Sequence, residues 1–287
     1  MDNPVWMVLR GLSRGLHLAG YFSAFGAALF GAVIMPVPGL RRLAWGGFAV
    51  AVLGGAAWFW LQTADFASAR SPSAVLAALP LVAEYTRFGW LTLARLALLL
   101  LAVLCAQGRR WRLAAALAGL GVLGESWLGH GAAMTGMEGW FLFACSLAHI
   151  GAAAAWLGTL PALALGLCSG VSPMVLAQRY SRLGMLCVAA ILVTAFLQYL
   201  LLIGRVSAFF NTGYGEAALL KLVLFAALLT LAARNRWRLT PALPASRAAL
   251  LRAILWETAL GVLVLLAAGV LMQLSPPVMA AMAGMAS

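Results

Sequence analysis

Metal-ligating side chains of a soft or borderline kind gather between residues 125 and 161. These are His130, Met134, Met137, Cys145 and His149. Imidazole, thioether and thiol groups suit copper, whereas magnesium and calcium prefer oxygen ligands. The residue types in this stretch therefore predict a site for a soft metal ion, with copper as the expected ion.

The first three of these ligands form the pattern H-x-x-x-M-x-x-M at His130, Met134 and Met137. In a helix, residues at this spacing share one face. Neighbouring glycines would equally allow a loop to wrap around an ion. We expect a metal-capture site here, and the alternative is an exposed loop with a solvated histidine.

A second group lies deeper in an apolar run. His149 follows Cys145 by four residues, so that the two share a helical face. An imidazole inside a bilayer usually serves a function. His17, in the outer third of the first apolar run, could meet His149 across a helix bundle. The alternative is that each histidine bonds to a neighbouring serine or carbonyl, such as Ser146.

The last residues, 275–287, are rich in methionine. Met279, Met282 and Met285 recur at every third position among small residues. Three thioether sulfurs at this spacing could converge on one ion. We expect a metal-binding tail, and the alternative is a frayed terminus.

The composition places these ligands in a membrane. The chain has 287 residues with a mean hydropathy of +1.00. Only 9% of its residues are charged, against about 25% in soluble domains. The net charge of +12 comes from arginine clusters between apolar runs, an arrangement that signals topology and not nucleic-acid binding. The four cysteines have no close spacing typical of zinc fingers.

Eight apolar runs are long enough to cross a bilayer, which needs roughly 20 residues for each helix. They cover residues 16–35, 43–62, 88–106, 112–128, 140–167, 183–204, 217–233 and 253–274. The first run is longer than a signal-peptide core, so we expect it to be retained. The sequence predicts an all-α, polytopic bundle of eight transmembrane helices forming a single domain over 1–287.

Arginine and lysine residues set the predicted orientation. The connections after the odd-numbered runs contain twelve of these residues, whereas the opposite side contains six. Positively charged connections stay in the cytoplasm, so both termini should face the periplasm. In the second connection, Ser71 before Pro72 predicts a short surface helix near 72–79.

Charged residues inside the runs should be paired, because an isolated charge in a bilayer is costly. Arg95 and Glu125 both fall toward the outer side, and we expect an ion pair between them. Glu257 falls toward the cytoplasm, where we expect it to pair with an arginine of the seventh connection.

Several segments together resemble one known family. They read G-H-G-A-A at 129–133, H-I-G-A-A-A-A-W-L-G-T-L-P-A-L at 149–163, R-Y-S-R-L-G at 179–184, T-G-Y-G-E-A-A-L-L-K-L at 212–222 and N-R-W-R-L-T-P-A-L at 235–243. In order and spacing they resemble the copper-resistance protein D (CopD) family of bacterial inner-membrane proteins, over a core of about 88–274.

The resemblance implies eight helices, outward termini and movement of copper from periplasm to cytoplasm. It also implies a small periplasmic copper-binding protein of the CopC type as a partner. Among the ligands it points to His130 and His149. The family pattern has an acidic residue three positions before the second histidine, where this chain has Ser146.

These observations favour a copper permease of the bacterial inner membrane that is not an enzyme, since the sequence shows no nucleotide-binding loop. Copper would be captured by the outer histidine and methionines or by the tail. It would then pass His149, His17 and Cys145, and leave toward the cysteines near the inner ends of the spans, Cys105, Cys168 and Cys187. Two alternatives remain open. One is a b-type haem protein with His17 and His149 as ligands, and the other is a copper-binding assembly factor that does not transport.

Overall fold

The computed structural model describes residues 4–129 and 136–278, and these residues form helices and no strands. The elements of the first half are α1 (Pro4–Leu29), η1 (Phe30–Ile34), α2 (Leu40–Phe66), α3 (Pro72–Tyr85), α4 (Arg87–Gln107), α5 (Trp111–Gly124) and η2 (Glu125–Leu128). Those of the second half are α6 (Gly136–Cys168), α7 (Pro173–Leu202), α8 (Ala208–Asn211), α9 (Gly213–Arg234), η4 (Asn235–Leu239) and α10 (Arg247–Leu271).

The predicted all-α membrane bundle is confirmed. Within the described ranges, 7 helices are long and apolar enough to cross a bilayer. The predicted span at 112–128 corresponds to α5, an α-helix of 14 residues, followed by the four-residue 3₁₀ helix η2. An α-helix of this length is shorter than a bilayer requires, so the count of eight spans stays a prediction.

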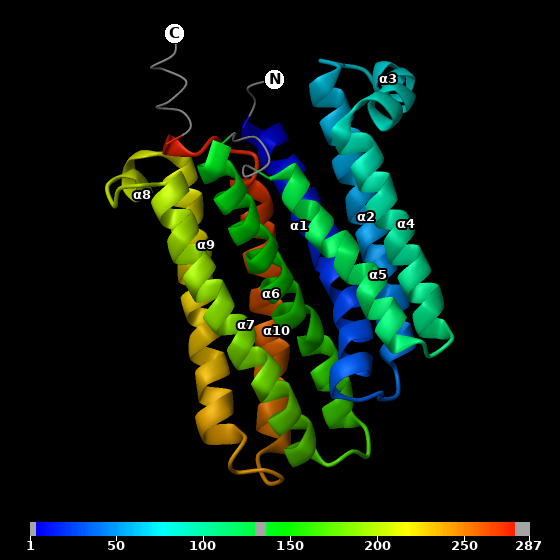
Figure 1. The fold of residues 1–287 in the computed structure, drawn as a ribbon, viewed down its shortest axis with the longest axis vertical. Coiled ribbons are helices and arrows are strands. Elements are labelled where there is room, and N and C mark those ends of the chain that lie inside the picture. The colour runs from blue at the N-terminus through cyan, green and yellow to red at the C-terminus, as the bar shows by residue number, and fades with distance from the viewer. Residues whose placement is uncertain (1–3, 130–135, 279–287) are drawn as a thin grey trace.

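Helix α1 forms the centre of the bundle. It contacts α2, α4 and α5 on one side and α6 and α10 on the other, while α7 and α9 extend the second group (Figure 1). Of the seven spans, α1 is the most buried and the one containing α9 is the least buried. Helix α1 begins and α10 ends at the same end of the bundle, which also carries α3 and α8 (Figure 1). We call this the α3 end.

Glycines allow α1 to approach its neighbours closely. A Cβ atom on Gly26 would overlap the backbone of Gly158 in α6, and one on Gly20 would overlap the backbone of α2. Small residues at such crossings bring membrane helices into direct backbone contact. The Gly26–Gly158 crossing therefore fixes the side of α1 that faces α6.

The expected surface helix is present as α3, and it is longer than predicted. Ser71 caps its first turn by accepting a hydrogen bond from the backbone nitrogen of Ala74 at 3.3 Å, with Pro72 at the first helical position. Thr86 then caps α4 in the same way, through the backbone nitrogen of Gly89 at 2.9 Å. The two caps fix where α3 and α4 begin, and α3 packs against both α2 and α4.

Candidate functional site

His149 is held in a fixed orientation by a neighbouring helix. Its Nδ1 lies 2.9 Å from the hydroxyl oxygen of Thr194 in α7. That hydroxyl donates its own hydrogen to the Ala190 carbonyl at 2.7 Å, so its oxygen accepts the hydrogen on Nδ1. In the neutral ring the lone pair is then on Nε2, which has no hydrogen bond to any described residue. Metal-ligating histidines typically show this arrangement.

Cys145 lies one turn before His149 on the same face of α6. Its side chain is buried and its thiol forms no disulfide. Ser146, at the position where the resemblance implies an acid, donates its hydroxyl to the Leu142 carbonyl at 2.8 Å. Lys221 of α9 lies near enough to His149 for their charges to interact. The described residues therefore place one imidazole and one thiol a helical turn apart on the same face of α6, and their role as metal ligands stays a prediction.

His17 also uses Nδ1 for a protein contact. This atom lies 2.8 Å from the Ala51 carbonyl of α2, and a carbonyl only accepts, so Nδ1 donates. The ring is fully buried, and its Nε2 has no hydrogen-bond partner in the part of the chain that the structure describes. Space for the ring depends on Gly55, because a Cβ there would come within 2.8 Å of Nδ1.

The two histidines do not meet, contrary to the expectation that His17 and His149 face each other across the bundle. His17 precedes Gly26 by nine residues, which is about two and a half helical turns. It therefore points away from the side of α1 that packs on α6, and it faces α2. A haem held between these two histidines does not fit this arrangement.

Most of the predicted outer ligands lie outside the described residues, namely His130, Met134, Met279, Met282 and Met285. Met137 is described, in the first turn of α6, and 85% of its surface is exposed. Among the described residues, no group of three or more His, Cys, Asp or Glu side chains could hold a metal ion. The predicted outer clusters therefore stay predictions.

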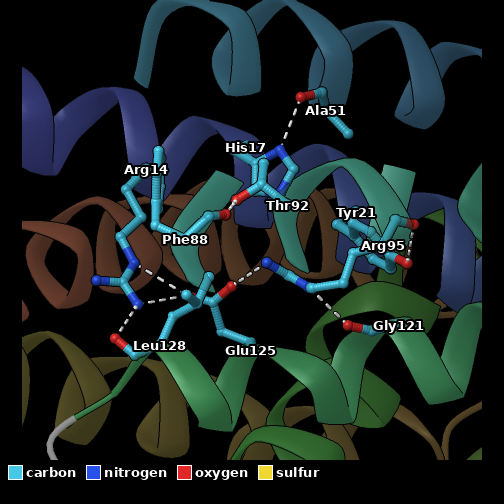
Figure 2. A network of polar contacts seen from close by, with 10 residues as sticks. All are labelled: Arg14, His17, Tyr21, Ala51, Phe88, Thr92, Arg95, Gly121, Glu125 and Leu128. Atoms are coloured by element: carbon cyan, nitrogen blue, oxygen red, sulfur yellow. Dashed lines mark hydrogen bonds and ion pairs between the residues drawn. The ribbon is translucent and has the colours of Figure 1, made fainter. Parts of the chain in front are cut away.

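The ion pair expected between Arg95 and Glu125 is confirmed, and it belongs to a larger network (Figure 2). Arg14 donates to the other oxygen of Glu125, from Nε at 2.9 Å and from Nη2 at 2.6 Å. Glu125 is fully buried, and Arg14 and Arg95 are almost fully buried. Two guanidinium groups thus share one carboxylate inside the apolar bundle.

Backbone carbonyls complete this network. Arg95 donates from Nε to the Gly121 carbonyl at 2.7 Å, and Arg14 donates to the Leu128 carbonyl at 3.2 Å. Tyr21 of α1 donates its hydroxyl to the Arg95 carbonyl at 2.9 Å. The network therefore ties α1, α4 and the end of α5 together beside His17 (Figure 2).

A cavity of about 590 Å³ borders this network at Arg14 and Leu128, and we call it the vestibule. Its lining includes Arg10, Arg14, Asp65 and Arg87, together with aromatic side chains of α2 and α4. Arg10 forms an ion pair with Asp65. Basic groups therefore outnumber acidic ones in the vestibule.

Glu257 does not have the arginine partner expected for it. Its carboxylate accepts a hydrogen bond from the side-chain amide of Asn235, and both side chains are buried. Asn235 begins the π-helix η4 directly after α9, and this irregular turn places it beside α10. Arg236, the next residue of η4, donates instead to Ser181 of α7.

Two family models and one curated relative that match this chain are all described as copper resistance protein D. The family model described as "Copper resistance protein D" matches residues 174–271, and the model described as "Copper resistance protein D-like, N-terminal domain" matches residues 4–140. A protein named copper resistance protein D from Pseudomonas syringae pv. tomato is 33% identical over 135 residues. That match covers 44% of this chain and 44% of the relative, less than half the length of each. No solved structure matches the chain.

Proposed function

Because the chain belongs to the copper resistance protein D family, we propose that it moves copper ions across the bacterial inner membrane, from the periplasm to the cytoplasm. Its apolar helices and its family support a copper-related membrane protein. In this proposal copper is the transported substrate and not a resident cofactor, and the chain acts as a permease and not as an enzyme.

One observation carries the proposal, namely the ligand pair on α6. His149 has its Nδ1 held by Thr194 and makes no hydrogen bond from Nε2 to a described residue, and Cys145 lies one turn away. A nitrogen and a sulfur donor together favour copper over hard cations. A histidine at this depth in a membrane helix commonly marks an ion pathway. His17, by contrast, has no cysteine or methionine one helical turn away in α1, so it lacks the sulfur donor that Cys145 supplies beside His149.

The outer end supplies the capture step in this proposal. The distribution of arginines favours a periplasmic location for the α3 end. Met137 is exposed there, at the start of the helix that contains His149. His130, Met134 and the three tail methionines, Met279, Met282 and Met285, would add thioether and imidazole donors. A periplasmic copper-binding protein of the CopC type would deliver the ion to them.

Uptake into proteoliposomes tests the transport step. The full chain is reconstituted into vesicles that contain a trapped Cu(I) chelator, and Cu(I) is added outside under reducing conditions. We expect the chelator signal to rise faster than in protein-free vesicles of the same lipid. If the protein binds copper but the signal does not exceed that of protein-free vesicles, the permease proposal is wrong and a binding or assembly role replaces it.

A further inference from the structure

The vestibule contains more positive charge than its own residues neutralise. Its lining has three guanidinium groups, those of Arg10, Arg14 and Arg87, against the single carboxylate of Asp65. Arg10 and Asp65 neutralise each other as an ion pair. Behind the lining, Glu125 is shared between Arg14 and Arg95. Among these described residues, four guanidinium groups therefore face two carboxylates, which leaves two positive charges in excess.

Of these positive charges, that of Arg87 is accessible to solvent. It begins α4 directly after the Thr86 cap, and its side chain is exposed. No ion pair or side-chain hydrogen bond of Arg87 occurs among the described residues. Arg14, by contrast, is buried with its position fixed by Glu125 and Leu128. The vestibule thus combines one rigid guanidinium group with one that is free to close on a ligand.

Unpartnered polar atoms gather around the same cavity. Arg10 Nε and Trp58 Nε1 are buried without a hydrogen-bond partner among the described residues, and both residues line the vestibule. The Nε2 atom of His17 is unpartnered as well, and its ring packs against Trp58 with ring centroids 5.8 Å apart. Buried polar groups are nearly always satisfied in native proteins. These atoms place hydrogen-bond donors or acceptors in or beside the walls of the vestibule that no described residue satisfies.

The remaining walls are aromatic. Trp58, Phe66 and Phe88 line the vestibule, and the guanidinium of Arg14 lies 4.9 Å from the ring centroid of Trp58. A volume of about 590 Å³ is in the range of sites that hold a whole organic ligand. The lining therefore suits an anion that is attached to an apolar body.

We propose that the vestibule binds a phosphate group between Arg14 and Arg87, with its aromatic wall against the apolar part of the same molecule. Phosphate oxygens can accept hydrogen bonds from two guanidinium groups at once. This site lies between α1, α2 and α4, apart from the copper ligands on α6. The phosphate inference does not depend on the transport proposal. The positive charges of Arg14 and Arg87 that would attract a phosphate would repel a copper ion.

Lipid retention by the full chain tests this inference. The purified protein is freed of lipid in a neutral detergent, and the binding of phosphatidylglycerol and of inorganic phosphate is titrated separately by native mass spectrometry. We expect Arg87→Gln to weaken binding by about tenfold, because one charge-assisted contact is lost. Arg87→Lys should recover part of the loss, because it keeps the charge without the planar fork.

Arg205→Gln is the matched control, because Arg205 is also exposed and lies at the α3 end, between α7 and α8. Arg87 is exposed, so its replacement should leave folding intact. Binding of phosphatidylglycerol that excess inorganic phosphate does not displace assigns the site to a lipid headgroup, whereas binding of inorganic phosphate itself assigns it to a soluble phosphate. The inference fails if wild type binds neither probe, or if Arg87→Gln and Arg205→Gln bind equally well.

Discussion

Glu125→Gln is expected to destabilise the folded protein by about 3–5 kcal/mol, which is the effect of removing one partner from a buried ion network. The carboxylate is fully buried and is the counter-charge that Arg14 and Arg95 share. A glutamine of similar shape would leave two guanidinium groups inside the bundle without a counter-charge. Thermal unfolding in detergent measures the loss as a lower midpoint temperature.

Glu84→Gln is the matched control, since Glu84 is exposed in α3, at the same end of the bundle, and its replacement should change the midpoint little. A triple variant with Met at Arg14, Arg95 and Glu125 gives a second comparison. It removes all three charges together, so it should be more stable than Glu125→Gln alone. If Glu125→Gln melts within error of Glu84→Gln, the network does not hold α1, α4 and α5 together.

Thr194→Val should weaken copper binding by about 10- to 100-fold, the usual cost of removing a hydrogen bond that orients a metal-ligating histidine. Valine has the shape of threonine but cannot accept the hydrogen on His149 Nδ1, which lies 2.9 Å from the hydroxyl. The ring would then lose its fixed orientation, although His149 and Cys145 are both still present. Competition against a Cu(I) chelator of known affinity measures the change.

Thr230→Val serves as the control for this experiment. The hydroxyl of Thr230 makes the same kind of helical bond, to the Ala226 carbonyl at 2.8 Å, but it is exposed on α9 and contacts no histidine. Its replacement should leave copper affinity unchanged. Equal affinities of the two valine variants would mean that Thr194 does not orient a copper ligand.

Much of the helical framework could be predicted from sequence, because apolar length and capping residues are local signals. The run at 88–106 corresponds to α4 within one residue at each end. The cap at Ser71 and Pro72 located the start of α3. Helix α7 begins at Pro173 and not at 183, because proline favours the first turn of a helix and here stands before the apolar part begins.

The side-chain partners were harder to predict, because they depend on how helices rotate against one another. Arg14 and Glu125 are 111 residues apart, and Arg14 was counted only as a topology signal. From sequence, His17 could meet His149 across the bundle, but Gly26, which brings α1 against α6, lies on the opposite side of the helix. Sequence spacing within α6 did predict that Cys145 and His149 share a face. It could not show that Thr194 of α7 orients the ring.

The central claim is that copper binds on the α6 side of α1, at His149, and not at His17. The most direct test is the metal content, by mass spectrometry, of full-length protein purified with Cu(I) under reducing conditions. Wild type, His149→Ala and His17→Ala are compared after gel filtration confirms that each is folded. We predict that wild type and His17→Ala retain copper and that His149→Ala loses it. Retention of copper by His149→Ala at the wild-type level, or no copper in wild type, would contradict this account.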